Sequence, residues 1–194
     1  MLEYICCSYI FRSNVSFNFS RINQSETYSI QDCTYYWDCL SDDGHWTWGN
    51  VAHSFSSNGV TTSRSSGTGA VCAYSDITLP TNFECEFTWN GGTAYSICVN
   101  AGGGGIEKPI GQNQTWYYLR ECANASANAQ TVNENATSGD VFKIKRDNGI
   151  LYFYRNNVQV ASITPSNPNY DKLELTAFSS NRNSTLKDIK VKPL

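Results

Sequence analysis

The chain has 194 residues, of which 13% are aromatic and 16% are charged, and its formal net charge is −3 at pH 7. This length suits a single all-β sandwich, and twelve Tyr, nine Phe and five Trp supply enough apolar surface for one core. There is no broad basic field to bind a phosphate backbone, and no run long enough to span a bilayer. We therefore expect neither a nucleic-acid partner nor insertion into a membrane.

The N-terminus and the eight cysteines bear on where the protein is found. The first residues lack the positive region and the apolar core of a signal peptide, so we expect a protein made without a leader, a setting that suits reduced cysteines but leaves disulfides open. No Cys-x-x-Cys pair occurs and only two His are present, which argues against structural zinc. The Ser- and Asn-rich composition is typical of viral and extracellular β proteins, and the combination predicts a virion or extracellular-surface protein.

Residues 1–34 are rich in Ser and Asn with interspersed aromatic residues, and we expect an extended arm or edge strands there. The segment could contact other virion subunits in an oligomer, or it could add strands to the same domain, and the sequence leaves both open. Residues 35–194 are expected to form the sandwich. Helical periodicity is nearly absent from the chain, whereas short alternating runs separated by Gly, Asn, Ser and Pro recur.

The segment 42–54 is rich in Trp and contains both His. Trp46 and Trp48 share a face if this run is a strand, and with Asn50 they form a candidate site for stacking on a sugar ring. Asp42 and Asp43 could supply oxygen ligands to Ca²⁺, although a turn capped by their side chains explains them as well. We expect no other cofactor.

The runs 83–89 and 94–99 alternate apolar and polar residues on either side of a glycine-containing loop. We predict that they pair as a hairpin, because a register with Cys85 opposite Val99 brings both apolar sets onto one face. Cys85 then points into the core. A further alternating run at 184–192 is expected to be a final strand in which Leu186 and Ile189 lie on opposite faces.

Two turns, at 147–150 and at 155–158, predict a three-stranded meander over residues 141–163. Counting outward from the turns sets Lys143 opposite Tyr154, Tyr154 opposite Gln159, and Phe153 opposite Val160. The period of two assigns the core face to Phe142, Ile144, Leu151, Phe153, Val158 and Val160. It assigns the other face to Lys143, Lys145, Tyr152, Tyr154 and Gln159.

This second face of the meander is another candidate glycan site, because tyrosine rings stack on sugars and the polar groups beside them can bind hydroxyls. The alternative is ordinary cross-strand packing, with the lysine stems lying along the tyrosine rings.

The order of these runs resembles that of concanavalin A-like lectin/glucanase (laminin-G-like) domains. Residues 59–63, 76–80 and 82–87 resemble the front half of such a domain, and residues 139–144, 151–157 and 186–191 resemble the back half. The resemblance covers roughly residues 36–194. It implies an all-β, two-sheet antiparallel sandwich of the jelly-roll type, with first and last strands side by side, here 36–40 against 186–191. Lectins, glycosidases, adhesins and phage tail or surface proteins share this fold.

The glucanase members of that family carry a Glu-x-Asp-x-x-Glu-like run on one strand. Here Glu84 and Glu86 are followed by Thr88 and Trp89, so the third acidic residue is missing, which argues against hydrolysis. We predict a non-enzymatic carbohydrate-binding or host-attachment module of a virus- or phage-like particle or of a cell surface, with a glycan or host receptor as its partner. A purely structural capsid, tail or decoration protein, and a glycoside hydrolase or lyase using Glu84 and Glu86, are the alternatives.

Overall fold

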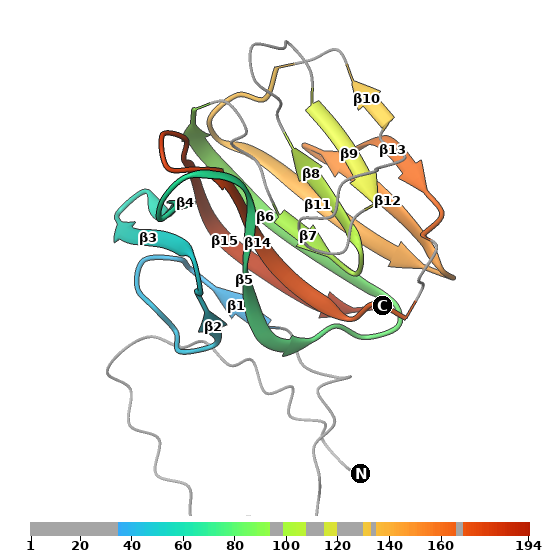
Figure 1. The fold of residues 1–194 in the computed structure, drawn as a ribbon. Coiled ribbons are helices and arrows are strands. Elements are labelled where there is room, and N and C mark those ends of the chain that lie inside the picture. The colour runs from blue at the N-terminus through green and yellow to red at the C-terminus, as the bar shows by residue number, and fades with distance from the viewer. Residues whose placement is uncertain (1–34, 94–98, 108–114, 120–129, 133–134, 166–168) are drawn as a thin grey trace, which may run out of the picture.

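The computed structural model describes residues 35–93, 99–107, 115–119, 130–132, 135–165 and 169–194. In these ranges every regular element is a strand, and the strands form two antiparallel sheets packed face to face (Figure 1). The prediction of an all-β, two-sheet antiparallel sandwich is confirmed. Within the same ranges, no helix is long and apolar enough to cross a membrane. The arm predicted for residues 1–34 lies outside the described residues.

One sheet, here called sheet A, contains the predicted meander and the last strand of the chain. Its strand order is β13 (Val158–Ile163), β12 (Ile150–Arg155), β11 (Asp140–Asp147), β6 (Phe83–Gly92), β15 (Ser184–Pro193), β4 (Gly59–Arg64) and β3 (Val51–Ser56). The first described strand, β1 (Tyr35–Trp37), also pairs with β15, and Trp37 lies opposite Ile189. The expectation that the first and last strands lie side by side is therefore confirmed.

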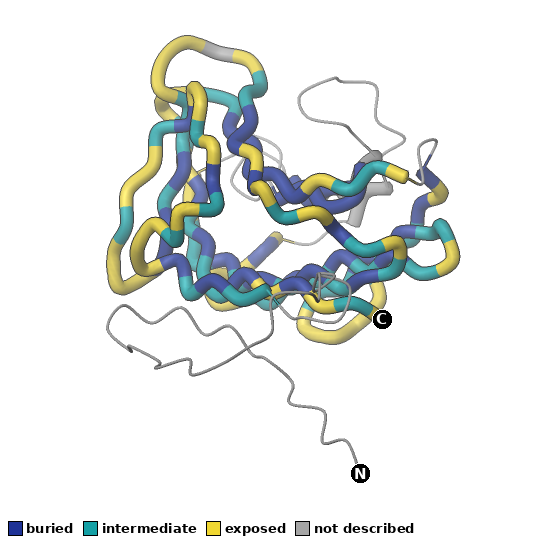
Figure 2. Tube along the Cα trace, turned by 90° about the horizontal axis from the view of Figure 1, so that it is seen from below, coloured by how far each residue is buried: buried dark blue, intermediate teal, exposed yellow. Residues whose placement is uncertain are grey.

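The other sheet, sheet B, is built largely from the middle of the chain. Its strand order is β10 (Gln130–Val132), β9 (Thr115–Leu119), β8 (Gly104–Glu107), β7 (Val99–Ala101), β14 (Lys172–Ser179), β5 (Thr68–Thr78) and β2 (Trp46–Thr47). Buried residues occur along both layers (Figure 2), and their hydrophobic members form one core cluster.

Strict alternation in the central strands of sheet A produces this core. In β6 and β11 every second residue is buried, and the side chains between them are only partly exposed. Phe87 and Phe142 lie opposite each other in the register, with stacked rings 5.8 Å apart. Burying a large side chain such as these stabilises a fold by roughly 1.5–3 kcal/mol.

The meander forms as predicted at both turns and departs from the prediction only beyond the second. Lys143 lies opposite Tyr154, and Tyr154 lies opposite Gln159. A register shift next to Phe153 then places Ala161 opposite Phe153, where Val160 was expected. Such a bulge inserts one residue and changes which side chains face the core. One predicted core position was wrong, since Val158 is 65% exposed, whereas Val160 is partly buried and packs against the core, and Ala161 and Ile163 are buried.

The predicted pairing of Cys85 with Val99 does not form, and residues 94–98 of the predicted hairpin lie outside the described residues. β6 pairs with β11 and β15 in sheet A, whereas Val99 lies in β7 of sheet B, opposite Leu175 and Ile106. The chain crosses from one sheet to the other between these strands, and each apolar face meets the core from its own side. Cys85 nevertheless points inward as predicted, with 0% of its surface exposed.

The last strand also contains an irregularity that alternation did not predict. Leu186 and Ile189 are both buried although they are three residues apart. The register shifts between Lys187 and Lys190, and Asp188 has a positive φ of 54°. This local bulge turns both apolar side chains toward the core, so the prediction that they face opposite ways was wrong.

Three cysteines fall within the described residues. Cys39 and Cys85 are buried free thiols, and burial raises the pKa of Cys85 to about 12. Cys72 is disulfide-bonded, which is one of the two states that the sequence left open. The two free thiols are inert at neutral pH, since the thiolate is the reactive form.

Candidate functional site

The outer face of sheet A carries two parallel rows of polar and aromatic side chains, here called the Tyr–Lys–Glu face. One row consists of Tyr154, Lys143, Glu86 and Lys190, which are successive partners across four strands. The second row consists of Tyr152, Lys145, Glu84 and Lys192. Neighbouring strands are about 4.8 Å apart, so each row is roughly 14 Å long.

A network of ion pairs occupies the centre of this face. Lys143 Nζ lies 3.6 Å from an oxygen of Glu84 and 3.5 Å from an oxygen of Glu86. Lys192 Nζ lies 2.9 Å from the same oxygen of Glu84. Burial raises the pKa of Glu84, but the hydrogen bond from Lys192 and the charge of Lys143 outweigh burial and hold that pKa below its usual value. A general acid needs a raised pKa, so Glu84 is poorly suited to that role.

All five residues predicted for the meander site lie together at one end of the Tyr–Lys–Glu face. Lys143 Nζ lies 5.8 Å from the centre of the Tyr154 ring, and the Tyr154 hydroxyl donates to Gln159 Oε1 at 3.4 Å. Lys145 pairs with Asp147 at 3.0 Å, and Tyr152 and Tyr154 are partly exposed. The face thus combines cross-strand packing with rings that keep part of their surface in solvent.

A shallow pocket of about 60 Å³ lies between the strands of this face. Its lining residues are Glu84, Glu86, Lys143, Lys190 and Lys192. This volume admits a functional group of a ligand rather than a whole sugar ring, because ligand pockets usually measure about 300 Å³ or more. A ligand on this face would therefore lie across it and insert only a substituent.

The Trp-rich segment forms a packed aromatic cluster rather than an open platform. Trp46 is only 8% exposed, and its ring lies 5.3 Å from that of Trp37. Trp48 is covered by His53, whose ring stacks on it at 3.8 Å. The predicted site with Trp46, Trp48 and Asn50 is thus not supported as a sugar-stacking surface, because the rings close the end of the sandwich. Asn50 is exposed beside them.

Asp42 and Asp43 cap the turn that precedes β2. Asp42 accepts from the Gly44 amide at 2.9 Å and from the Trp48 indole at 3.2 Å. Asp43 accepts from the Tyr35 hydroxyl at 2.6 Å and from the His45 amide at 3.1 Å. Among the described residues, no group of three or more His, Cys, Asp or Glu is placed to hold a metal ion. The candidate calcium site therefore consists of only these two carboxylates, both of which cap the turn.

A buried polar cluster on the outer side of sheet B was not found from the sequence. Glu174 of β14 is 0% exposed and accepts from Asn100 Nδ2 at 2.7 Å and from the Tyr170 hydroxyl. Glu107, on β8, is buried as well. One signal was available: Glu174 stands between Leu173 and Leu175, so alternation places a carboxylate on the far side of an otherwise apolar strand.

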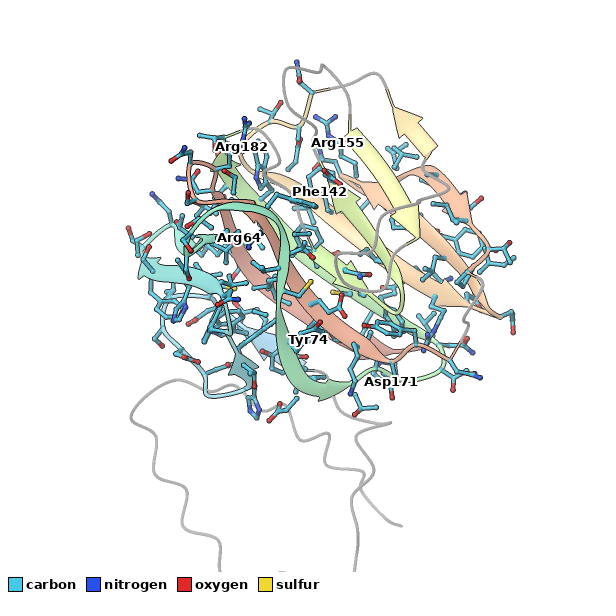
Figure 3. The ribbon with its side chains drawn as sticks, in the orientation of Figure 1. Arg64, Tyr74, Phe142, Arg155, Asp171 and Arg182 are labelled. Carbon is cyan, nitrogen blue, oxygen red and sulfur yellow. The ribbon has the colours of Figure 1, made fainter. Side chains whose placement is uncertain are left out.

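The exposed part of that side of sheet B includes Tyr74 on β5. Tyr74 is 41% exposed, and Figure 3 shows it with Asp171 at the lower end of the sandwich. Tyr74 lies opposite Glu174 in the register of β5 and β14. The outer sides of both sheets thus bear an aromatic residue near carboxylates.

No family model and no curated protein matches the chain. Solved structures do match it. The carbohydrate-binding module CBM66 from Bacillus subtilis is 12% identical, with a TM-score of 0.59 over 75% of this chain and 94% of that one. The β-glucanase of Bacillus licheniformis is 12% identical, with a TM-score of 0.58 over 83% and 98%. The Crh5 transglycosylase in complex with NAG is 11% identical, with a TM-score of 0.62 over 82% and 83%.

These similarities and the sheet order together define the fold. The chain has the concanavalin A-like jelly-roll fold that the order of its sequence runs resembled. The structures that share it include both a binding module and enzymes, so the fold alone does not determine the activity.

Proposed function

We propose that this chain is a non-enzymatic carbohydrate-binding module and that its ligand lies across the Tyr–Lys–Glu face. The arrangement of Tyr152 and Tyr154 carries the proposal. The two residues are on the same side of β12, two positions apart, which spaces them by about 7 Å. Partly exposed rings on a flat sheet can stack on successive sugars, while Lys143, Lys145 and Gln159 beside them supply hydrogen bonds to hydroxyls.

The ion pairs of Glu84 and Glu86 support the proposal that the module is not an enzyme. Both carboxylates lie within 3.6 Å of the single ammonium of Lys143, and the pKa of Glu84 is lowered. Glycosidases need one carboxyl group that is protonated when the reaction begins. A strong attraction to two lysines opposes that protonation.

The proposed setting is the surface of a virus- or phage-like particle or of a cell, where the module would attach to host glycans. The Ser- and Asn-rich composition supports an exterior location. The disulfide at Cys72 supports an oxidising environment. If the chain is instead a purely structural subunit, its aromatic face would be buried between subunits, and it would form stable oligomers without binding sugar.

The experiment is a glycan-array screen of the purified chain together with a Tyr152→Ala, Tyr154→Ala double variant. We expect selective binding by the wild type and at least a tenfold loss in the variant, because each 1.4 kcal/mol of lost contact energy weakens affinity tenfold. Tyr74→Ala is the matched control, since it removes an exposed tyrosine from the other sheet. Loss in Tyr74→Ala alone would move the site to sheet B, and silence of the wild type on the array would reject a carbohydrate ligand.

A glycoside hydrolase is the second candidate, and one observation favours it. Glu174 is a fully buried carboxylate held by Asn100 and Tyr170, an arrangement that can also orient a catalytic group. Hydrolysis of soluble β-glucans by the wild type, with loss in Glu174→Gln, would establish this function. Activity lost only in a Glu84→Gln, Glu86→Gln double variant would place the reaction on sheet A instead.

A further inference from the structure

A larger hollow lies apart from the Tyr–Lys–Glu face, at the edge of sheet A formed by β3 and β4. It has a volume of about 320 Å³, which is within the usual range for small-ligand sites. Its walls are the β3–β4 hairpin and the turn between β14 and β15, including Arg182, which Figure 3 shows near the end of β4. We call this hollow the hairpin groove.

The lining of the hairpin groove is polar and contains no carboxylate. It includes the hydroxyl-bearing residues Ser54, Thr61 and Ser63, together with Asn181 and Arg182. A groove without Asp or Glu offers little to a metal ion, which needs anionic oxygen ligands. A groove whose lining is mainly hydroxyls and amides also offers little to an apolar ligand.

Several of these polar groups are available to a ligand. The side chains of Ser54, Ser63 and Asn181 make no hydrogen bond to any other residue that the structure describes. The groove thus presents hydroxyl and amide groups that both donate and accept.

The groove is also held in shape before any ligand binds. The hairpin is paired continuously from Val51 opposite Arg64 to Ser56 opposite Gly59, and the Trp48 indole stacks under the His53 ring at 3.8 Å. The opposite wall is fixed to Thr93, whose hydroxyl accepts from the Asn183 amide at 2.9 Å. A site that is already ordered loses less conformational entropy on binding.

From these observations we infer a second saccharide site in the hairpin groove, one that takes a neutral sugar ring. The dense hydroxyl and amide lining matches the alternating donors and acceptors of a polyol. The inference extends the proposed carbohydrate-binding function to a second, separate surface. Two sites on one chain would raise the apparent affinity for a polysaccharide that reaches both.

The test is an NMR titration of the ¹⁵N-labelled chain with neutral hexasaccharides of glucose, mannose and xylose. We expect shifts of the Ser54, Ser63 and Asn181 amides that saturate and persist in the Tyr152→Ala, Tyr154→Ala variant. A Ser63→Ala, Asn181→Ala variant should bind at least fivefold more weakly at the groove. Ser66→Ala is the matched control, because Ser66 is exposed just beyond β4 and does not line the groove.

The outcomes separate this inference from the proposed function. Wild-type binding that shifts only residues of the Tyr–Lys–Glu face, and that is unchanged in the groove variant, would overturn the second site alone. If the groove residues shift and the tyrosine substitutions do not weaken binding, the Tyr–Lys–Glu face is rejected as a binding site and the hairpin groove is retained. If no neutral sugar shifts the groove residues, the groove site is overturned, even if acidic glycans bind on the array.

Discussion

At the scale of single residues, Asp140, the first residue of β11, binds both the loop before this strand and the turn after β12. Its carboxylate lies 2.7 Å from an Arg155 guanidinium nitrogen and accepts from the Thr137 amide at 2.7 Å and from Asn156 Nδ2 at 2.8 Å. Figure 3 shows Arg155 at the upper end of the sandwich. Burial raises the pKa of Asp140, but these donors and the charge of Arg155 outweigh burial and lower it overall.

A lowered folded-state pKa makes Asp140 a source of pH-dependent stability. The contribution is fully present above the unfolded pKa of about 3.9 and is lost as the pH falls through the lower folded pKa. We expect Asp140→Asn to reduce the free energy of unfolding by about 2–3 kcal/mol at pH 7, because it removes the carboxylate that forms an ion pair with a partly buried guanidinium. Urea titrations at pH 7 and pH 3 measure this, and the difference from wild type should shrink at pH 3.

Asp76→Asn is the control for that measurement. Asp76 pairs with His45 at 2.9 Å, but its side chain is 66% exposed. Exposed ion pairs contribute roughly 0–1 kcal/mol, so this variant should remain close to wild type. An equal loss in both variants would show that burial does not distinguish the two pairs.

At the scale of elements, the pairing of β4 with β15 depends on a glycine at the start of β4. Gly59 has a φ of +113°, and a Cβ added there would lie 2.0 Å from the carbonyl oxygen of Leu186. The obstruction is backbone, so no side-chain rotation can relieve it. The close approach of the two strands therefore requires glycine at this position.

We expect Gly59→Ala to lower the free energy of unfolding by about 3 kcal/mol or more, or to prevent folding, because β4 must separate from β15. Gly44→Ala is the matched variant, since Gly44 has a φ of +81° and nothing within 4 Å of the added Cβ. It should lose only about 1 kcal/mol from backbone strain. Chemical denaturation of both variants gives the comparison, and equal losses would mean that strain rather than contact governs Gly59.

Arg146 connects elements in a different way, by holding two loops against the end of β11. Its buried guanidinium donates to the carbonyl oxygens of Pro80, Thr81 and Tyr170, each at 2.6 Å. The guanidinium also lies 4.9 Å from the Phe83 ring centre. Alternation alone would have assigned position 146 an apolar residue, and only the position of the loops explains an arginine there.

At the scale of the whole molecule, the placement of the capping carboxylates bears on calcium. Asp42 and Asp43 each accept two hydrogen bonds from their own turn and its neighbours. We therefore predict that glycan binding, measured on the array with calcium and again with chelator, is the same in both. A loss of binding with chelator that Asp42→Asn reproduces would contradict this prediction and assign the turn a calcium site.

Across the whole molecule, the features that follow a strict local pattern could be predicted from the sequence. The period of two in 83–89 and 141–154 determined which face of β6, β11 and β12 is buried, because one buried side of a strand fixes every second residue. The same alternation placed Tyr152, Tyr154, Lys143 and Lys145 on one outer face. The turn at 147–150 set the register between the two strands.

Other features depended on contacts that no local pattern contains. The sheet to which Val99 belongs, the bulges beside Phe153 and at Asp188, and the burial of Trp46 all depend on segments distant in the chain. The hairpin groove and the Glu174 cluster likewise combine residues from separate strands and turns. Local alternation and turns thus determined the strands and their inward faces, whereas partners, bulges and sites were decided by tertiary packing, since they depend on which distant surfaces meet.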